Sequence, residues 1–261
     1  MPASLGLPNL YFRTPLILGH RGASAYAPEN TLTAFRLALE QGADGIELDV
    51  TLTADGVPVV IHDDTVDRTT NGHGPVRALR LAELKGLEAG YPARFGRQFA
   101  GVRIPTLAEV FEACGEQPVI NVELKHDRSP GRQLARRVVD LIHAQGRQER
   151  VILSSFQFSS LGRVKALDPA LPVGLLYFAP MFGPRLAQLL ARRLPHEAHH
   201  PAAQGLTIKD IAWCHQHGYR VNAWTVDDEP GLRRLMADGV DGLITDRPDL
   251  AIAVRGGVGT A

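Results

Sequence analysis

Short runs of β-branched and aliphatic residues alternate with amphipathic stretches along most of the chain. The runs that we predict as buried strands are Leu16–Gly19, Gly45–Val50, Val119–Leu124, Val151–Ser154, Val173–Tyr177, Arg220–Thr225 and Gly242–Thr245. The stretches with helical periodicity include Thr31–Gln41, Arg132–Gln145, Phe158–Leu167, Pro184–Arg192, Ile208–His217 and Glu229–Asp238. Strands that alternate with helices in this way predict a parallel sheet with helical crossovers.

The run Pro58–His62 follows the second strand too closely to be its parallel neighbour. A short connection that contains Thr53-Ala54-Asp55-Gly56 joins it to the strand that ends near Leu52, whereas a parallel crossover needs about a dozen residues. We therefore predict an antiparallel hairpin whose turn is Asp55-Gly56. A two-residue turn would place His62 opposite Asp49.

Without this hairpin arm, seven clear parallel strands remain, and Pro195–His200 is the less regular eighth. Eight βα units in about 250 residues predict an α/β protein with the TIM (β/α)₈ barrel fold. The stretch from Asp63 to Pro105 interrupts the alternation with loop signals and one short helical segment, Leu81–Leu87. We expect a single domain over residues 1–261, with a small insertion after the second strand at about residues 63–105.

Composition narrows the classes of function. Lys plus Arg and Asp plus Glu are 28 each, so no basic surface is available for nucleic acid. No apolar run reaches the ~18 residues of a membrane span, and Met1–Thr14 lacks the regions of a secretory signal. We expect a cytoplasmic protein without stable membrane insertion, in which Cys114 and Cys214 are buried free thiols.

Carboxylates gather at the ends of the predicted strands, where a TIM barrel has its active site. Glu47 and Asp49 are two residues apart on one strand and face the same side, and Glu123 lies on the next parallel strand. Three converging carboxylates repel one another unless a cation or a proton intervenes. Oxygen-only ligation favours Mg²⁺ or Ca²⁺, although each carboxylate could instead belong to a structural ion pair.

Histidines and cations lie at the same strand ends. His20 and His62 are candidates for acid and base catalysis at neutral pH, and Arg21 and Lys125 for contacts to a phosphate group. Trp224 could form an apolar wall or simply pack in the barrel. His200 is a further candidate for lining the site, whereas we interpret the remaining histidines as ordinary polar residues: His73, His126, His143, His196, His199, His215 and His217.

A set of short motifs resembles the glycerophosphodiester phosphodiesterase family in order and spacing. The motifs are His20-Arg21-Gly22, Pro28-Glu29-Asn30-Thr31, Glu47-Leu48-Asp49-Val50, His62-Asp63, Asp67-Arg68-Thr69-Thr70-Asn71-Gly72, Ile104-Pro105-Thr106-Leu107, Glu123-Leu124-Lys125 and Ala223-Trp224-Thr225-Val226. The resemblance extends from about Leu16 to Pro248 and departs most around Pro195–Gln204. It implies hydrolysis of glycerophosphodiesters to glycerol 3-phosphate and an alcohol.

The resemblance also implies a role for each candidate residue. Glu47, Asp49 and Glu123 would hold a divalent metal, His20 and His62 would act as acid and base, and Arg21 and Lys125 would contact the phosphate. Two alternatives remain open. One is a related barrel phosphodiesterase acting on lysophospholipids or phosphoinositides, and the other is a catalytically silent module that binds phosphate esters.

Overall fold

The computed structural model describes residues 7, 10–127 and 131–258, and the predicted domain of residues 1–261 extends beyond them at both ends. Its strands are β1 (Leu16–His20), β2 (Gly45–Leu52), β3 (Pro58–Val60), β4 (Val119–Leu124), β5 (Val151–Ser155), β6 (Val173–Tyr177), β7 (Ala198–Pro201), β8 (Arg220–Ala223) and β9 (Gly242–Thr245). In this part of the chain all strands except β3 are parallel, and β1 pairs with both β2 and β9, which closes the barrel. The predicted TIM barrel is confirmed.

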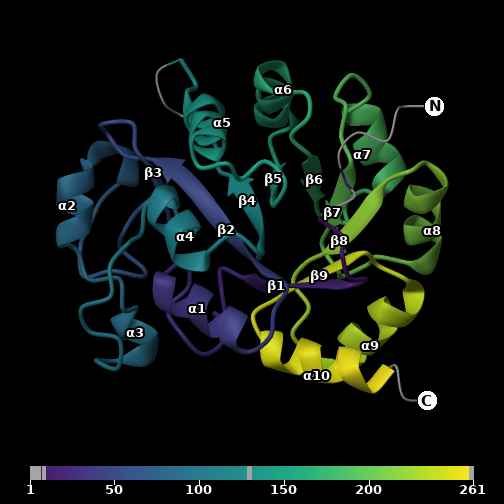
Figure 1. The fold of residues 1–261 in the computed structure, drawn as a ribbon, viewed down its shortest axis with the longest axis horizontal. Coiled ribbons are helices and arrows are strands. Elements are labelled where there is room, and N and C mark those ends of the chain that lie inside the picture. The colour runs from purple at the N-terminus through teal and green to yellow at the C-terminus, as the bar shows by residue number, and fades with distance from the viewer. Residues whose placement is uncertain (1–6, 8–9, 128–130, 259–261) are drawn as a thin grey trace.

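Helices surround the barrel on its outer face (Figure 1). They are α1 (Leu32–Glu40), α4 (Leu107–Cys114), α5 (Leu134–Ala144), α6 (Phe158–Leu167), α7 (Pro184–Leu190), α8 (Ile208–Gln216), α9 (Glu229–Asp238) and α10 (Pro248–Val258). Thr31, Thr106 and Thr207 cap three of them by accepting a hydrogen bond from a backbone amide of the first turn. No helix among the described residues is long and apolar enough to cross a membrane.

Alternation along β2 shows how the sequence assigns side chains to the two faces of the barrel. Ile46, Leu48 and Val50 have no exposed surface and belong to the core between the strands and the surrounding helices. Glu47 and Asp49 therefore point to the barrel interior, as the two-residue period requires. An apolar cluster lies in the barrel interior, with Leu16 and Leu18 of β1 among its members.

The hairpin of β2 and β3 is antiparallel as predicted, but its register differs by one residue. Val50 pairs with Val60, and the amide of Ile61 donates to the Asp49 carbonyl at 3.0 Å. The turn has three residues, Ala54-Asp55-Gly56, because Gly56 adopts a φ of 78°, which a three-residue loop of this kind requires. The prediction that His62 lies opposite Asp49 is wrong: Ile61 has that position, and His62 follows the end of the pairing.

Residues between β3 and α4 form a compact segment beside the hairpin. It contains a 3₁₀ turn, η1 (Val76–Ala78), and two short helices, α2 (Leu81–Gly86) and α3 (Pro92–Phe95). Val66, Val76 and Leu84 of this segment pack with Val59 and Ile61 of the hairpin in one buried cluster. The segment is thereby attached to the hairpin arm that carries His62.

Two predicted strands have different ends in the structure. The expected strand Pro195–His200 runs from Ala198 to Pro201, and the expected strand Arg220–Thr225 stops at Ala223. Trp224 makes only an isolated bridge to Ala202 beyond β7 and β8. Its side chain is thus placed at the rim of the barrel rather than within a regular strand.

Candidate active site

A cavity of about 130 Å³ lies at the carboxyl ends of the barrel strands. One side of it is polar and the other is apolar. The polar side is formed by His20, Arg21, Glu47, His62, Asn121, Glu123 and Lys125, and the apolar side by Phe156, Leu176, Phe178, Trp224 and Ile244. Seven of the eight site residues predicted from the sequence line this cavity, and the eighth, Asp49, is buried directly beside them.

Three carboxylates from two neighbouring strands converge at the cavity. Asp49 and Glu123 are partners across the β2–β4 pair, and Glu47 precedes Asp49 on the same face. One oxygen of each lies within 4.8 Å of the others, and among the described residues this is the single group of acidic, histidine or cysteine side chains close enough to hold a metal. Because bonds from Mg²⁺ or Ca²⁺ to oxygen are about 2.0–2.6 Å, one hard cation fits between these oxygens.

The electrostatics of the three carboxyl groups support the fit of a cation. Burial, together with the charge of Asp49, raises the pKa of Glu47 to about 8 and that of Glu123 to about 7. Burial acts in the same sense on Asp49, but Lys125 and Arg21 outweigh it and hold the pKa of Asp49 below its usual range. The raised pKa values of Glu47 and Glu123 favour their protonated forms, and a divalent cation would displace those protons.

Asn121 adds another oxygen at the floor of this cavity. It lies two residues before Glu123 on β4, its side chain is buried, and its Oδ1 has no hydrogen-bond partner among the described residues. An unpaired buried carbonyl oxygen is costly unless a ligand or water satisfies it. The oxygen-rich floor therefore favours a bound hydroxyl group or cation.

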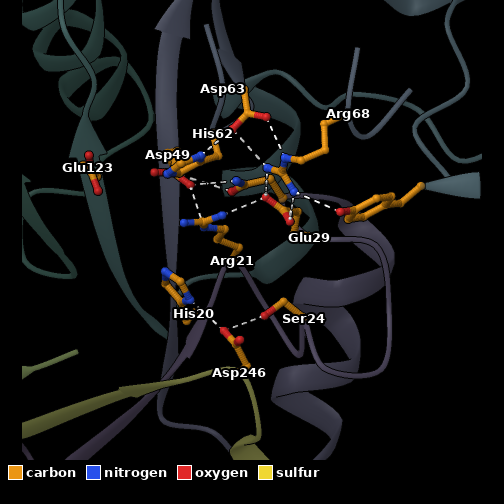
Figure 2. Close-up of polar contacts among 12 residues, drawn as sticks. His20, Arg21, Ser24, Glu29, Asp49, His62, Asp63, Arg68, Glu123 and Asp246 are labelled. Atoms are coloured by element: carbon orange, nitrogen blue, oxygen red, sulfur yellow. Dashed lines mark hydrogen bonds and ion pairs between the residues drawn. The ribbon is translucent and has the colours of Figure 1, made fainter. Parts of the chain in front are cut away.

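Each of the two candidate histidines is held by a carboxylate (Figure 2). Nδ1 of His20 is 2.6 Å from Oδ1 of Asp246, which also accepts a hydrogen bond from the Ser24 hydroxyl at 2.8 Å. Nδ1 of His62 is 2.6 Å from Oδ1 of Asp63. A carboxylate on Nδ1 leaves Nε2 as the ring nitrogen available for proton transfer.

The two imidazoles differ in charge preference. For His20, burial lowers the pKa, but the hydrogen bond to Asp246 and the charge of Glu47 raise it more, so the net shift is upward. For His62, burial and the charges of Arg21 and Lys125 lower the pKa, against the opposing effect of Asp49. Of the two histidines on this cavity, His20 is therefore the more basic and His62 the less basic.

Arg21 and Lys125 already contact the acidic groups. Arg21 places Nη1 at 2.8 Å from Glu29 and Nε at 3.2 Å from Asp49. Nζ of Lys125 lies 3.2 Å from Asp49 and 3.0 Å from Glu123. Both cations stand at the rim where an anionic substrate would enter, with their positions set by the carboxylates.

The apolar side is a cluster of three aromatic rings. Phe156 and Phe178 stack with ring centroids 5.3 Å apart, and Trp224 meets both nearly edge-on. The indole Nε1 of Trp224 donates to the His200 carbonyl at 2.7 Å, which fixes the ring. This side presents carbon surface and no free hydrogen-bonding group from its aromatic residues.

His200 does not line the cavity, and that prediction is wrong. Its ring is fully buried inside the barrel, within 2.9 Å of the Asn222 side-chain amide. Gly174 leaves room for it, because a Cβ at that position would come within 2.3 Å of the ring. His200 therefore packs below the site, between β6 and β8.

A second and larger cavity, of about 500 Å³, lies between the hairpin loop and the start of α5. Its lining includes Asp55, Arg77 and Arg137, and it contains none of the predicted site residues. The smaller cavity is the better candidate active site because the carboxylates, the histidines and the cations converge there.

Several residues at the site were not assigned by the sequence analysis. Asp63 and Glu29 stand in the quoted motifs, and Asp246 follows the last strand, so their positions were visible but their partners were not. Asn30, also in a quoted motif, donates from its side-chain amide to Asp49 at 2.8 Å. Phe156 and Phe178 follow β5 and β6 directly, and this position at strand ends was the signal that could have identified them.

Comparison with known proteins agrees with the fold and identifies a family. Residues 20–250 match the model of the glycerophosphoryl diester phosphodiesterase family. A glycerophosphodiester phosphodiesterase of Caldanaerobacter subterraneus subsp. tengcongensis is 44% identical over 91% of this chain and 96% of its own, and one of Bacillus subtilis is 35% identical over 93% and 87%. A phosphodiesterase of Oleispira antarctica, solved with the product sn-glycerol 3-phosphate, superposes with a TM-score of 0.84 at 31% identity over 93% and 97%.

The family match covers most of the chain, and these relatives align over nearly their full lengths. The resemblance seen in the sequence motifs is thereby confirmed. The chain belongs to the glycerophosphoryl diester phosphodiesterase family.

Proposed function

We propose that the protein hydrolyses glycerophosphodiesters, such as glycerophosphocholine and glycerophosphoethanolamine, to glycerol 3-phosphate and an alcohol. The observation that carries this proposal is the pair of carboxylate-held histidines, His20 and His62, on one cavity with three acidic residues. The relative from Oleispira antarctica that was solved with sn-glycerol 3-phosphate gives further support.

Glu47, Asp49 and Glu123 would hold one divalent cation, Mg²⁺ or Ca²⁺. When bound, the cation polarises a phosphate oxygen and lowers the pKa of a hydroxyl group beside it. Lys125, which contacts Asp49 and Glu123, would turn toward the phosphate. Arg21 would add a second positive charge at the same group.

The histidines would transfer the protons. One takes the proton of the glycerol 2-hydroxyl as its oxygen attacks phosphorus, and the other donates a proton to the oxygen of the departing alcohol. The P–O bond to the alcohol breaks as the new P–O bond closes a cyclic phosphate. Water then opens the ring with the two roles reversed, which yields glycerol 3-phosphate and restores both histidines.

The apolar side of the cavity would receive the alcohol. Phe156, Phe178 and Trp224 offer ring faces to a methyl-rich group such as choline. The polar floor with Asn121 would receive the glycerol hydroxyls. The substrate would thus lie across the cavity, with its phosphate between the two histidines.

A lysophospholipid substrate is a second candidate, and one specific observation favours it. Phe156 and Phe178 are 40% and 46% exposed beside the cavity, and Met181 in the following loop is 76% exposed. Such carbon surface could contact an acyl chain. Release of choline from soluble glycerophosphocholine and from micellar lysophosphatidylcholine distinguishes the two: a higher kcat/KM for the micellar substrate would favour the lipid.

We also propose a cytoplasmic location and a small-molecule partner. The buried free thiols of Cys114 and Cys214 are consistent with a reducing compartment. Fractionation of cells that express the native protein at its natural level tests the location.

The experiment that tests the function is an activity screen of metal-stripped protein. Protein treated with EDTA is assayed on a set of glycerophosphodiesters, with Mg²⁺, Ca²⁺ and Mn²⁺ added back singly. We expect no turnover without metal and recovery with Mg²⁺ or Ca²⁺. Full turnover in EDTA would contradict the metal site, and no turnover with any metal would favour a silent binding module.

A further inference from the structure

The segment between β3 and α4 reaches the candidate site through Arg68. Its guanidinium makes a bidentate contact with Asp63, Nε to Oδ2 at 2.6 Å and Nη2 to Oδ1 at 3.1 Å. It makes a second bidentate contact with Glu29, Nη1 to Oε2 at 2.7 Å and Nη2 to Oε1 at 2.8 Å. Figure 2 shows Arg68 between the two carboxylates.

Each of these carboxylates continues to a site residue. Asp63 accepts from Nδ1 of His62 at 2.6 Å, so its orientation sets the imidazole. Glu29 accepts from Nη1 of Arg21 at 2.8 Å, and Arg21 in turn contacts Asp49. One guanidinium therefore joins the loop that carries His62 to the loop after β1 that carries Arg21.

The geometry of the contact depends on arginine. Only a planar fork of donors can satisfy two carboxylates bidentately, and the single ammonium of lysine cannot. The ring of Tyr91 lies 5.4 Å from the guanidinium carbon and holds it from the other side. Arg68 is 37% exposed, while its partners Glu29 and Asp63 are 9% and 30% exposed. Its paired hydrogen bonds hold the guanidinium and each carboxylate in one relative orientation, which is what a positioning residue requires.

We propose that Arg68 is a positioning residue that fixes the orientation of His62 through Asp63 and of Arg21 through Glu29. This inference rests on the proposed function for its kinetic consequences. We call the contacts of Arg68 with Asp63 and Glu29 the Arg68 clamp. Loss of this clamp would leave His62 and Arg21 in place but loosely oriented. Because misplacement of a reacting group by about 1 Å can cost about 100-fold in rate, the effect should appear in kcat more than in KM.

The test compares Arg68→Ala and Arg68→Lys with a matched control, Arg94→Ala. Arg94 belongs to the same segment and also contacts the loop after β1, through the Ala25 carbonyl at 3.2 Å, but it touches neither Asp63 nor Glu29. We expect kcat to fall about 10- to 100-fold in both Arg68 variants, with KM changed less than about threefold. Arg94→Ala should keep the wild-type kcat.

A double-mutant cycle locates the action of Arg68. If it acts through Asp63, adding Arg68→Ala to Asp63→Ala should cost much less than Arg68→Ala alone, because coupled residues are non-additive. Wild-type kcat in both Arg68 variants, or strictly additive losses in the cycle, would overturn the proposal. Arg68→Lys keeps the charge, so it allows the comparison even where the alanine variant folds poorly.

Nitrogen-15 NMR of the His62 ring gives a readout that does not depend on turnover. In the wild-type protein the proton should reside on Nδ1, facing Asp63, and in the Arg68 variants the two nitrogens should share it. An unchanged tautomer in the variants would contradict the clamp. If the wild-type protein proves inactive on glycerophosphodiesters, the proposed function fails. The NMR result alone then decides whether Arg68 orients His62.

Discussion

At the scale of single residues, the site combines two histidines whose pKa values shift in opposite directions with three closely spaced carboxyl groups. His20 ends β1 and His62 follows β3, more than 40 residues later, yet each has a carboxylate on Nδ1. The gathering of the two histidines and the three carboxylates at one end of the barrel could be predicted from the sequence, because these residues lie on predicted strands or directly after them. Their partners Asp246 and Asp63 could not, because such hydrogen bonds depend on how distant loops approach one another.

Replacing either histidine should remove most of the activity. We expect His20→Ala and His62→Ala each to lower kcat by at least about 100-fold, since a positioned acid or base contributes about 10²–10⁴-fold. His73→Ala is the matched control, because His73 is exposed, contacts Asp67 and is not among the residues that line the cavity. Near-wild-type steady-state turnover in either His20→Ala or His62→Ala would mean that the proposed mechanism is wrong.

Binding of a divalent metal should release protons. Glu47 and Glu123 have pKa values near 8 and 7, so both are largely protonated at about pH 6 and must ionise to bind metal. Calorimetry in buffers of different ionisation enthalpy should detect about two protons released at pH 6 and almost none at pH 9. Glu123→Gln should release about one fewer, and equal release at both pH values would contradict the crowded triad.

The same shifts set the sign of a stability effect. A carboxyl group whose pKa is raised in the folded state binds protons there more tightly than in the unfolded chain. Its stabilising contribution is present below the ordinary value of 4.5 and is lost as the pH rises toward about 8. Metal-free protein should therefore become less stable across this window, and bound metal should oppose the loss.

At the scale of elements, the hairpin of β2 and β3 shows where prediction from the sequence ends. The connection between the two strands is too short for a parallel crossover, so the antiparallel pairing was predictable. The register was not, because Asp55-Gly56 suits either a two-residue turn or the end of a three-residue one. The structure has the longer turn, and His62 reaches the cavity from beyond the paired residues rather than from within the strand.

The turn gives an element-scale prediction. Gly56 has a φ of 78°, and a Cβ there would make only ordinary van der Waals contacts with the Arg137 side chain, so Gly56→Ala chiefly tests the backbone conformation. We expect a loss of about 1 kcal/mol in the free energy of unfolding, measured in urea. Gly86→Ala, at a helical position with open space around it, should be neutral or slightly stabilising; equal effects would argue against the turn conformation described.

At the scale of the whole molecule, the barrel was predictable because strand and helix patterns alternate along the chain outside residues 63–105. The packing of the segment between β3 and α4 was not, since its loops carry little periodicity. Val66 and Leu84 share a buried cluster with Val59 and Ile61 of the hairpin. We propose on this ground that the segment and the barrel form a single folding unit.

Thermal unfolding should therefore show one cooperative transition. Calorimetry of the metal-free protein should give a calorimetric enthalpy equal to the van't Hoff enthalpy, and limited proteolysis should not release the segment around residues 63–105 first. Two resolved transitions would show that the segment unfolds separately from the barrel.

The central claim is that residues at the cavity cleave the ester bond between phosphate and the departing alcohol, such as choline, and leave the phosphate on glycerol. Phosphorus-31 NMR of glycerophosphocholine incubated with the protein and Mg²⁺ or Ca²⁺ tests it most directly, with Glu123→Gln and EDTA-treated protein as controls. We predict that glycerol 3-phosphate accumulates with active protein and metal and is strongly reduced in both controls. Formation of phosphocholine in its place, or no change in the substrate signal with either metal, would contradict the account.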